Sequence, residues 1–103
     1  MSNNVIQRLW ERRDRLNIMA EIMEAAKGRQ LKTRIMYSVN LSFSQVNGYL
    51  SFLTERGFVR VQMENGKKFY ETTPKGNIYI ENYREMLKLL KTQEPAKAQV
   101  ILS

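Results

Sequence analysis

The pattern of apolar positions changes its period in the middle of the chain and then changes back. As far as Gly57, apolar residues recur mostly three and four positions apart, which is the spacing of amphipathic helices. From Phe58 to Glu64, apolar and polar side chains alternate, which is typical of a half-buried strand. Helical spacing returns after Thr73. The pattern therefore predicts helices, then a β-hairpin, then a last helix.

The first predicted helix lies within residues 5–27, which contain neither proline nor glycine. A charged run, Arg-Arg-Asp-Arg at 12–15, interrupts its apolar pattern and leaves two interpretations open. The run is either a solvated stretch of one long helix, or the place where Asp14 caps a helix that begins there. Gly28 is expected to end the helix as its left-handed residue.

A short extended segment and a short helix are predicted next. Residues 29–32 are extended in character, and Thr33 is expected to cap a helix from Arg34 to Val39. Asn40 tolerates the left-handed conformation that the following turn requires.

The helix after this turn carries the clearest start signal in the chain. Ser42 and Gln45 fit a capping box, and Leu41 with Val46 fits the hydrophobic staple beside it. The helix is expected to end at Gly57. Its predicted core stripe is Val46, Leu50 and Leu53. Two helices joined by a short turn, the second strongly capped, form a helix-turn-helix motif.

A hairpin and a last helix complete the predicted fold. Asn65-Gly66 is the strongest two-residue hairpin signal, and residues 67–72 return as the partner strand. Thr73 is expected to cap the last helix, with Pro74 at its first position. A hairpin that directly follows a helix-turn-helix is a wing. The sequence thus predicts an α+β, mainly helical fold, a winged helix-turn-helix with a C-terminal dimerisation helix. The expected segments are an N-terminal helical arm (1–13), the winged helix-turn-helix domain (14–73), the dimerisation helix (74–94) and a flexible tail (95–103).

Composition removes several classes of function. The chain has no cysteine and no histidine, so it lacks disulfides, zinc sites built on these residues, and the commonest general base. No nucleophile motif, phosphate-binding glycine loop or carboxylate pair stands out, so we expect no enzyme, no metal, no cofactor and no small-molecule ligand. No apolar run is long enough to cross a bilayer, and no secretory signal is recognisable. We therefore expect a cytoplasmic, nucleoid-associated protein that does not contact membranes.

The charge balance favours a polyanionic partner. Lysine and arginine number 17 against 10 acidic residues, a formal net charge of +7. The whole stretch between Glu24 and Glu55 contains no acidic residue, although it spans most of the predicted helix-turn-helix. This distribution predicts a DNA-binding face free of carboxylates, since DNA-binding surfaces contact phosphates.

The candidate DNA-binding residues lie on the helix-turn-helix and on the wing. Basic and hydroxyl side chains at the two helix starts suit phosphate contacts, and Asn or Gln can pair with adenine. Gly48 is expected to permit a close approach to this helix. The predicted site is Lys32, Arg34, Ser42, Ser44, Gln45, Asn47, Ser51, Lys67 and Lys68. Two plainer interpretations stay open, namely that Gln45 serves only its own cap and that the wing lysines only deter edge-to-edge aggregation.

The last helix carries a heptad-like apolar stripe. Its members are Tyr79, Tyr83, Met86, Leu87 and Leu90. The stripe either packs only on its own domain or forms a homodimer interface, and the apolar residues around Trp10 are a second surplus that favours a dimer. Such a dimer would place two recognition helices on successive turns of DNA.

Several short runs resemble one family closely. These are residues 32–43 (Lys-Thr-Arg-Ile-Met-Tyr-Ser-Val-Asn-Leu-Ser-Phe), Tyr49-Leu50 followed by Leu53, Gly57-Phe58-Val59, and Thr73-Pro74-Lys75-Gly76. They resemble the small, chromatin-associated winged-helix proteins of the Sulfolobus "ten-a" type and their archaeal relatives, over about residues 14–90. The resemblance implies an archaeal, homodimeric protein that binds double-stranded DNA and is joined by an antiparallel coiled coil of its last helices. The last helix is shorter than the family's, and the arm before Asp14 is an addition.

The sequence therefore predicts a homodimeric double-stranded DNA-binding protein, either an architectural chromatin protein or a transcriptional regulator. The alternative is a winged-helix module for protein–protein interaction whose basic face is incidental. RNA binding is less favoured, because aromatic residues on an open sheet face are lacking. The predicted recognition helix, Phe43 to Arg56, has no lysine or arginine before Arg56. This absence predicts modest specificity or a preference for A·T-rich sites.

Overall fold

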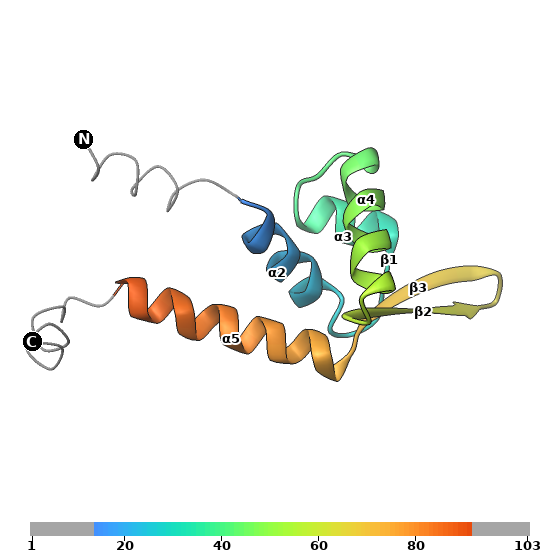
Figure 1. Cartoon of the computed structure of the whole chain (residues 1–103). Coiled ribbons are helices and arrows are strands. Elements are labelled where there is room, and N and C mark those ends of the chain that lie inside the picture. Colours follow the sequence, from blue (N-terminus) through green and yellow to red (C-terminus); the bar gives the residue numbers. More distant parts are fainter. Residues whose placement is uncertain (1–13, 92–103) are drawn as a thin grey trace, which may run out of the picture.

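The computed structural model describes residues 14–91 (Figure 1). In chain order the elements are α2 (Arg15–Ala25), β1 (Gln30–Leu31), α3 (Lys32–Ser38), α4 (Phe43–Glu55), β2 (Val59–Glu64), β3 (Lys67–Thr72) and α5 (Pro74–Lys91). The strands form one antiparallel sheet in the order β1-β3-β2. The predicted α+β, mainly helical winged helix-turn-helix is confirmed. The predicted arm and tail lie outside the described residues, as do the last three residues of the expected dimerisation helix.

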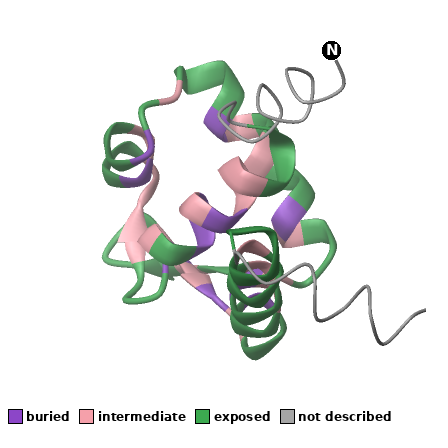
Figure 2. Ribbon diagram, turned by 90° about the vertical axis from the view of Figure 1, so that its left-hand side faces the viewer, coloured by how far each residue is buried: buried purple, intermediate pink, exposed green. Residues whose placement is uncertain are grey.

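One hydrophobic core joins the four described helices to the sheet. In Figure 2 the buried positions face inward, whereas most of α5 is exposed. The core consists of Ile22, Met23, Ala26, Ile35, Val39, Val46, Leu50, Leu53, Val59, Tyr70 and Ile80. The predicted stripe of α4 is thus confirmed, and α5 contributes Ile80 to the same core.

The start of α2 agrees with one of the two open interpretations, and its end differs from the prediction. Asp14 caps α2, because its Oδ1 accepts a hydrogen bond from the Asn17 backbone N at 2.8 Å. The left-handed residue after α2 is Arg29, with φ 65°, so the prediction for Gly28 is wrong. Arg29 adopts this conformation because tertiary contacts hold it. Its guanidinium pairs with Glu64 at 2.5 Å and lies 4.5 Å from the centroid of the Phe69 ring.

The start of α3 also differs from the prediction. The helix begins at Lys32, its N-cap residue is Leu31, and no side chain caps it, so the predicted cap at Thr33 is wrong. Pairing explains the earlier start. Leu31 is opposite Phe69 in the sheet, and the paired strand leads straight into the first helical turn. Asn40 is left-handed, with φ 57°, as predicted.

The capped helix and the hairpin form as the sequence predicts. The capping box of α4 is present, with Ser42 Oγ accepting from Gln45 N at 3.1 Å and Gln45 Oε1 accepting from Ser42 N at 3.0 Å. Asn65 and Gly66 have φ of 53° and 75°, as a type I′ turn requires. Thr73 Oγ1 accepts from Gly76 N at 3.2 Å, which confirms the predicted cap of α5.

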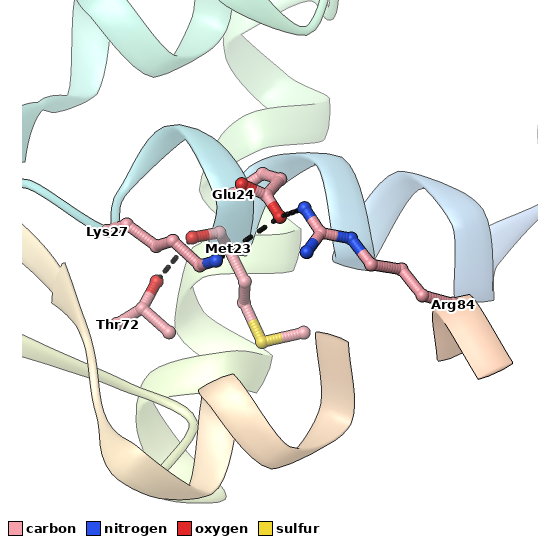
Figure 3. Close-up of polar contacts among 5 residues, drawn as sticks. All are labelled: Met23, Glu24, Lys27, Thr72 and Arg84. Atoms are coloured by element: carbon pink, nitrogen blue, oxygen red, sulfur yellow. Dashed lines mark hydrogen bonds and ion pairs between the residues drawn. The ribbon is translucent and has the colours of Figure 1, made fainter. Parts of the chain in front are cut away.

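Polar contacts fix α5 and β3 against α2 (Figure 3). Thr72 Oγ1 donates to the carbonyl oxygen of Met23 at 2.6 Å, and Glu24 pairs with both Arg84 and Lys27. Tyr79 OH donates to the carbonyl oxygen of Leu16 at 2.7 Å. Burial, followed by the nearby Tyr83 and Asp14, raises the pKa of Tyr79 to about 12, so this hydroxyl remains a donor even in moderately alkaline solution. In Figure 1, α5 extends past α2 toward the end of the molecule opposite the wing.

Candidate nucleic-acid interface

The outer face of α4 is polar, with two exposed phenylalanines. Val46, Leu50 and Leu53 face the core, which leaves Ser44, Gly48 and Ser51 on the exposed side. Phe43 is 59% exposed and Phe52 is 40% exposed. Within this helix no side chain is basic, so cations reach this face only from neighbouring elements.

Four of the predicted DNA-binding residues meet in one hollow between α4 and the sheet. This hollow of about 340 Å³, called the α4–wing hollow below, is lined by Lys32, Asn47, Leu50, Ser51, Thr54, Glu55, Val61, Lys68 and Tyr70. Lys32 Nζ donates a hydrogen bond to Asn47 Oδ1 across it. The start of α3, the middle of α4 and the wing thus place Lys32, Asn47, Ser51 and Lys68 together.

The other five predicted residues lie elsewhere. Ser44 and Gln45 line a hollow of about 420 Å³ that α4 forms with Arg15 and Met19 of α2. Arg34 lines a third hollow, of about 320 Å³, together with Tyr37.

The last two of these five lie at the ends of elements. Ser42 lies at the N-cap of α4, and Lys67 is exposed at the start of β3. The nine residues therefore do not form one compact cluster.

Ion pairing separates two groups of basic residues on this side of the molecule. Arg29 pairs with Glu64, and Arg60 pairs with Glu71 at 2.8 Å. Among residues 14–91, the ion pairs include none of Lys32, Arg34, Lys67 and Lys68. None of these four cations is therefore neutralised by an ion pair among the described residues.

One carboxylate intrudes on the predicted face. Glu55, on the last turn of α4, lines the α4–wing hollow beside Ser51 and Lys68. The acid-free stretch of sequence is therefore not an acid-free surface, because folding brings the carboxylate that ends this stretch back to the wing.

Phe43 and Arg15 are the neighbours of this surface that sequence reasoning missed. Phe43 precedes the core stripe of α4 and does not belong to it, and an apolar side chain off the stripe of a capped helix is the signal that could have identified it. Arg15 reaches α4 only through the packing of α2, which no local pattern reveals.

Two other kinds of feature, a metal site and a membrane-spanning helix, are absent from the described part of the chain. Among residues 14–91 no three His, Cys, Asp or Glu side chains are close enough to hold a metal ion. No helix in this part is long and apolar enough to span a membrane.

A capped second helix exposed beside a basic hairpin defines a winged helix-turn-helix protein. Residues 12–91 match the winged helix-turn-helix family, and the chain belongs to it. Two uncharacterised proteins of Methanocaldococcus jannaschii are each 34% identical to it. The match with MJ0290 covers 77% of this chain and only 36% of that protein, whereas the match with MJ0287 covers 70% of this chain and 81% of that protein.

A solved structure bears out the resemblance found in the sequence. Sso10a-2, a DNA-binding protein from Sulfolobus solfataricus, is 27% identical, with a TM-score of 0.72 over 85% of this chain and 93% of its own. The predicted membership of the small archaeal winged-helix type is confirmed.

Proposed function

We propose that this protein binds double-stranded DNA, with α4 in the major groove and the wing on the flanking backbone. The observation that carries the proposal is the convergence of Lys32 and Lys68 on the polar face of α4, with both lysines outside the ion pairs of the described residues. The similarity to Sso10a-2 supports it. We assign the protein an architectural or regulatory role at the nucleoid and no catalytic one.

Each predicted site residue has a role in this proposal. Ser44, Asn47 and Ser51 face base edges, because side chains on the exposed side of a recognition helix enter the major groove. The other side chains contact phosphates, which position a protein without reading sequence. These are Lys32, Arg34, Ser42, Lys67 and Lys68. Gln45 Oε1 accepts the capping hydrogen bond from Ser42 N, so this side chain stabilises the N-terminus of α4 that faces the DNA backbone.

A fluorescence-anisotropy titration on random-sequence duplex over a series of salt concentrations tests the proposal. We expect binding at low salt that weakens as salt is added. The slope of log affinity against log salt concentration should be about −0.9 for each phosphate that the protein neutralises. Absence of binding at low salt would contradict the proposal and favour the protein–protein interaction module.

We further propose that the protein is a homodimer joined through the C-terminal half of α5 in an antiparallel coiled coil. Tyr79 and Tyr83 already stack on each other within the protomer, with ring centroids 6.3 Å apart. Met86 and Leu90 continue the same helical stripe but are 41% and 62% exposed. An exposed continuation of a half-buried stripe is the kind of surface that a second copy covers.

Replacing Leu90 with glutamate is expected to shift the protein toward the monomer in sedimentation velocity, because it places a charge in the apolar interface. Leu89→Glu is the matched control. Leu89 is exposed on a different side of α5, and its replacement adds the same charge. If the unaltered protein sediments as a monomer, or if both variants behave alike, the proposed interface is wrong.

A further inference from the structure

Phe43 is an exposed apolar side chain at the place where a recognition helix meets bases. It is the first residue of α4, directly after the Ser42 cap, and it is 59% exposed. The N-terminal residues of a recognition helix contact base edges in the major groove. The capping box fixes the backbone on which the ring stands, so its position relative to the helix axis is defined.

Lys32 links this ring to the next turn of the helix. Its Nζ lies 5.3 Å from the centroid of the Phe43 ring and also donates to Asn47 Oδ1. A cation over an aromatic face stabilises that arrangement. With its Oδ1 engaged by Lys32, Asn47 keeps the N–H groups of its amide for another acceptor. Three side chains from two elements therefore form one cluster at the start of α4.

The chemistry of this cluster selects one kind of base. Arginine or lysine paired with guanine is the commonest specific contact in the major groove, and α4 contains neither residue. An apolar side chain has one distinctive partner there, the C5-methyl group of thymine. The N–H groups of Asn47 can donate to adenine N7 or thymine O4 but equally to the acceptors of guanine, so the preference for A·T rests on the methyl contact of Phe43.

We propose that Phe43 recognises thymine through its C5-methyl group, with Lys32 as the residue that positions Phe43 and Asn47. The inference rests on the proposed DNA binding and adds a specificity-determining residue to it. It assigns an A·T preference to a contact with a methyl group rather than to the absence of arginine.

Replacing thymine by uracil tests the proposal, because it removes the methyl group and leaves the pairing unchanged. The probes are two short duplexes of one mixed A·T sequence, one containing thymine and the other uracil. The unaltered protein is expected to bind the thymine duplex about fourfold more tightly for each methyl group buried. Phe43→Ala is expected to bind both duplexes equally and to keep its thermal unfolding temperature, since the ring is exposed.

Two matched controls separate this role from general effects. Phe52→Ala removes the other exposed phenylalanine of α4, which lies toward α2, and should preserve the thymine-to-uracil ratio. Lys32→Met should lower both the affinity and the ratio, whereas Lys68→Met should lower the affinity alone.

The outcomes distinguish this inference from the proposed function. No binding to either duplex would overturn DNA binding itself. Equal binding of the two duplexes by the unaltered protein would overturn the inference and leave DNA binding intact. If Phe43→Ala still prefers the thymine duplex to the uracil duplex, the preference comes from duplex shape. That result would also overturn the role of Phe43.

Discussion

Replacing Gly76 with alanine is expected to destabilise the fold by about 3 kcal/mol, although alanine is the better helix former. A Cβ at this position would lie 2.4 Å from the carbonyl oxygen of Phe58 and 2.5 Å from Thr72 Cγ2. The carbonyl of Phe58 cannot retreat easily, because it accepts hydrogen bonds from both the backbone N and Oγ1 of Thr73. Urea unfolding followed by circular dichroism measures the change.

Gly48 offers the matched control within the same molecule. It also lies inside a helix, but a Cβ there has no neighbour within 4 Å. Gly48→Ala is therefore expected to stabilise the fold by up to about 1 kcal/mol through helix propensity. If Gly76→Ala unfolds at the same urea concentration as the unaltered protein, α5 does not pack closely against Phe58 and Thr72.

Reversing the charge of both wing lysines, Lys67→Glu with Lys68→Glu, is expected to weaken duplex binding about 100-fold at moderate salt. The two substitutions remove two phosphate contacts and add repulsion. The plot of log affinity against log salt should also become shallower, its slope decreasing in magnitude by about two. Both side chains are exposed, so thermal unfolding should stay close to that of the unaltered protein. Anisotropy titrations at several salt concentrations give both quantities.

Lys88→Glu with Lys91→Glu makes the same change in net charge at the far end of α5 and is the control. It should alter the affinity little, because long-range attraction between exposed charges is screened within about 10 Å at moderate salt. Equal loss of affinity in the two double variants would mean that only net charge matters, and it would refute the wing as a contact surface.

Features that depend on a few neighbouring residues could be predicted from the sequence. The capping box at Ser42 and the turn at Asn65-Gly66 each need only side chains and backbone within about four residues, and both form as predicted. The alternation after Gly57 gave the wing for the same reason, since β2 and β3 are adjacent and their register follows from the turn.

Features that depend on distant residues could not be predicted. The start of α3 follows from the pairing of Leu31 with Phe69, and the left-handed conformation of Arg29 depends on Glu64 and Phe69. Glycine and threonine are common at such positions, so local preference favoured Gly28 and Thr33. Tertiary contacts outweighed that preference at both places.

The sequence was enough to predict which residues belong to the candidate site, but not how they are arranged in space. The pattern identified which side of α4 is exposed, but α2 and the wing flank that side and divide its residues between two hollows. The contact of Lys32 with Phe43 and Asn47 requires the angle between α3 and α4, which no spacing along the chain contains.

The direct passage of β1 into α3 has a mechanical consequence. Leu31 is paired with β3 of the wing and Lys32 is already helical, so β1 couples the wing to the helix-turn-helix without an intervening loop. A duplex that contacts both would meet a preorganised surface and freeze little conformational freedom in the protein. The duplex would then make any adjustment of shape, at a cost of roughly 1–6 kcal/mol for a substantial bend that depends on its sequence. In that case the stiffness of the DNA contributes sequence preference at base pairs that no side chain touches, which is indirect readout.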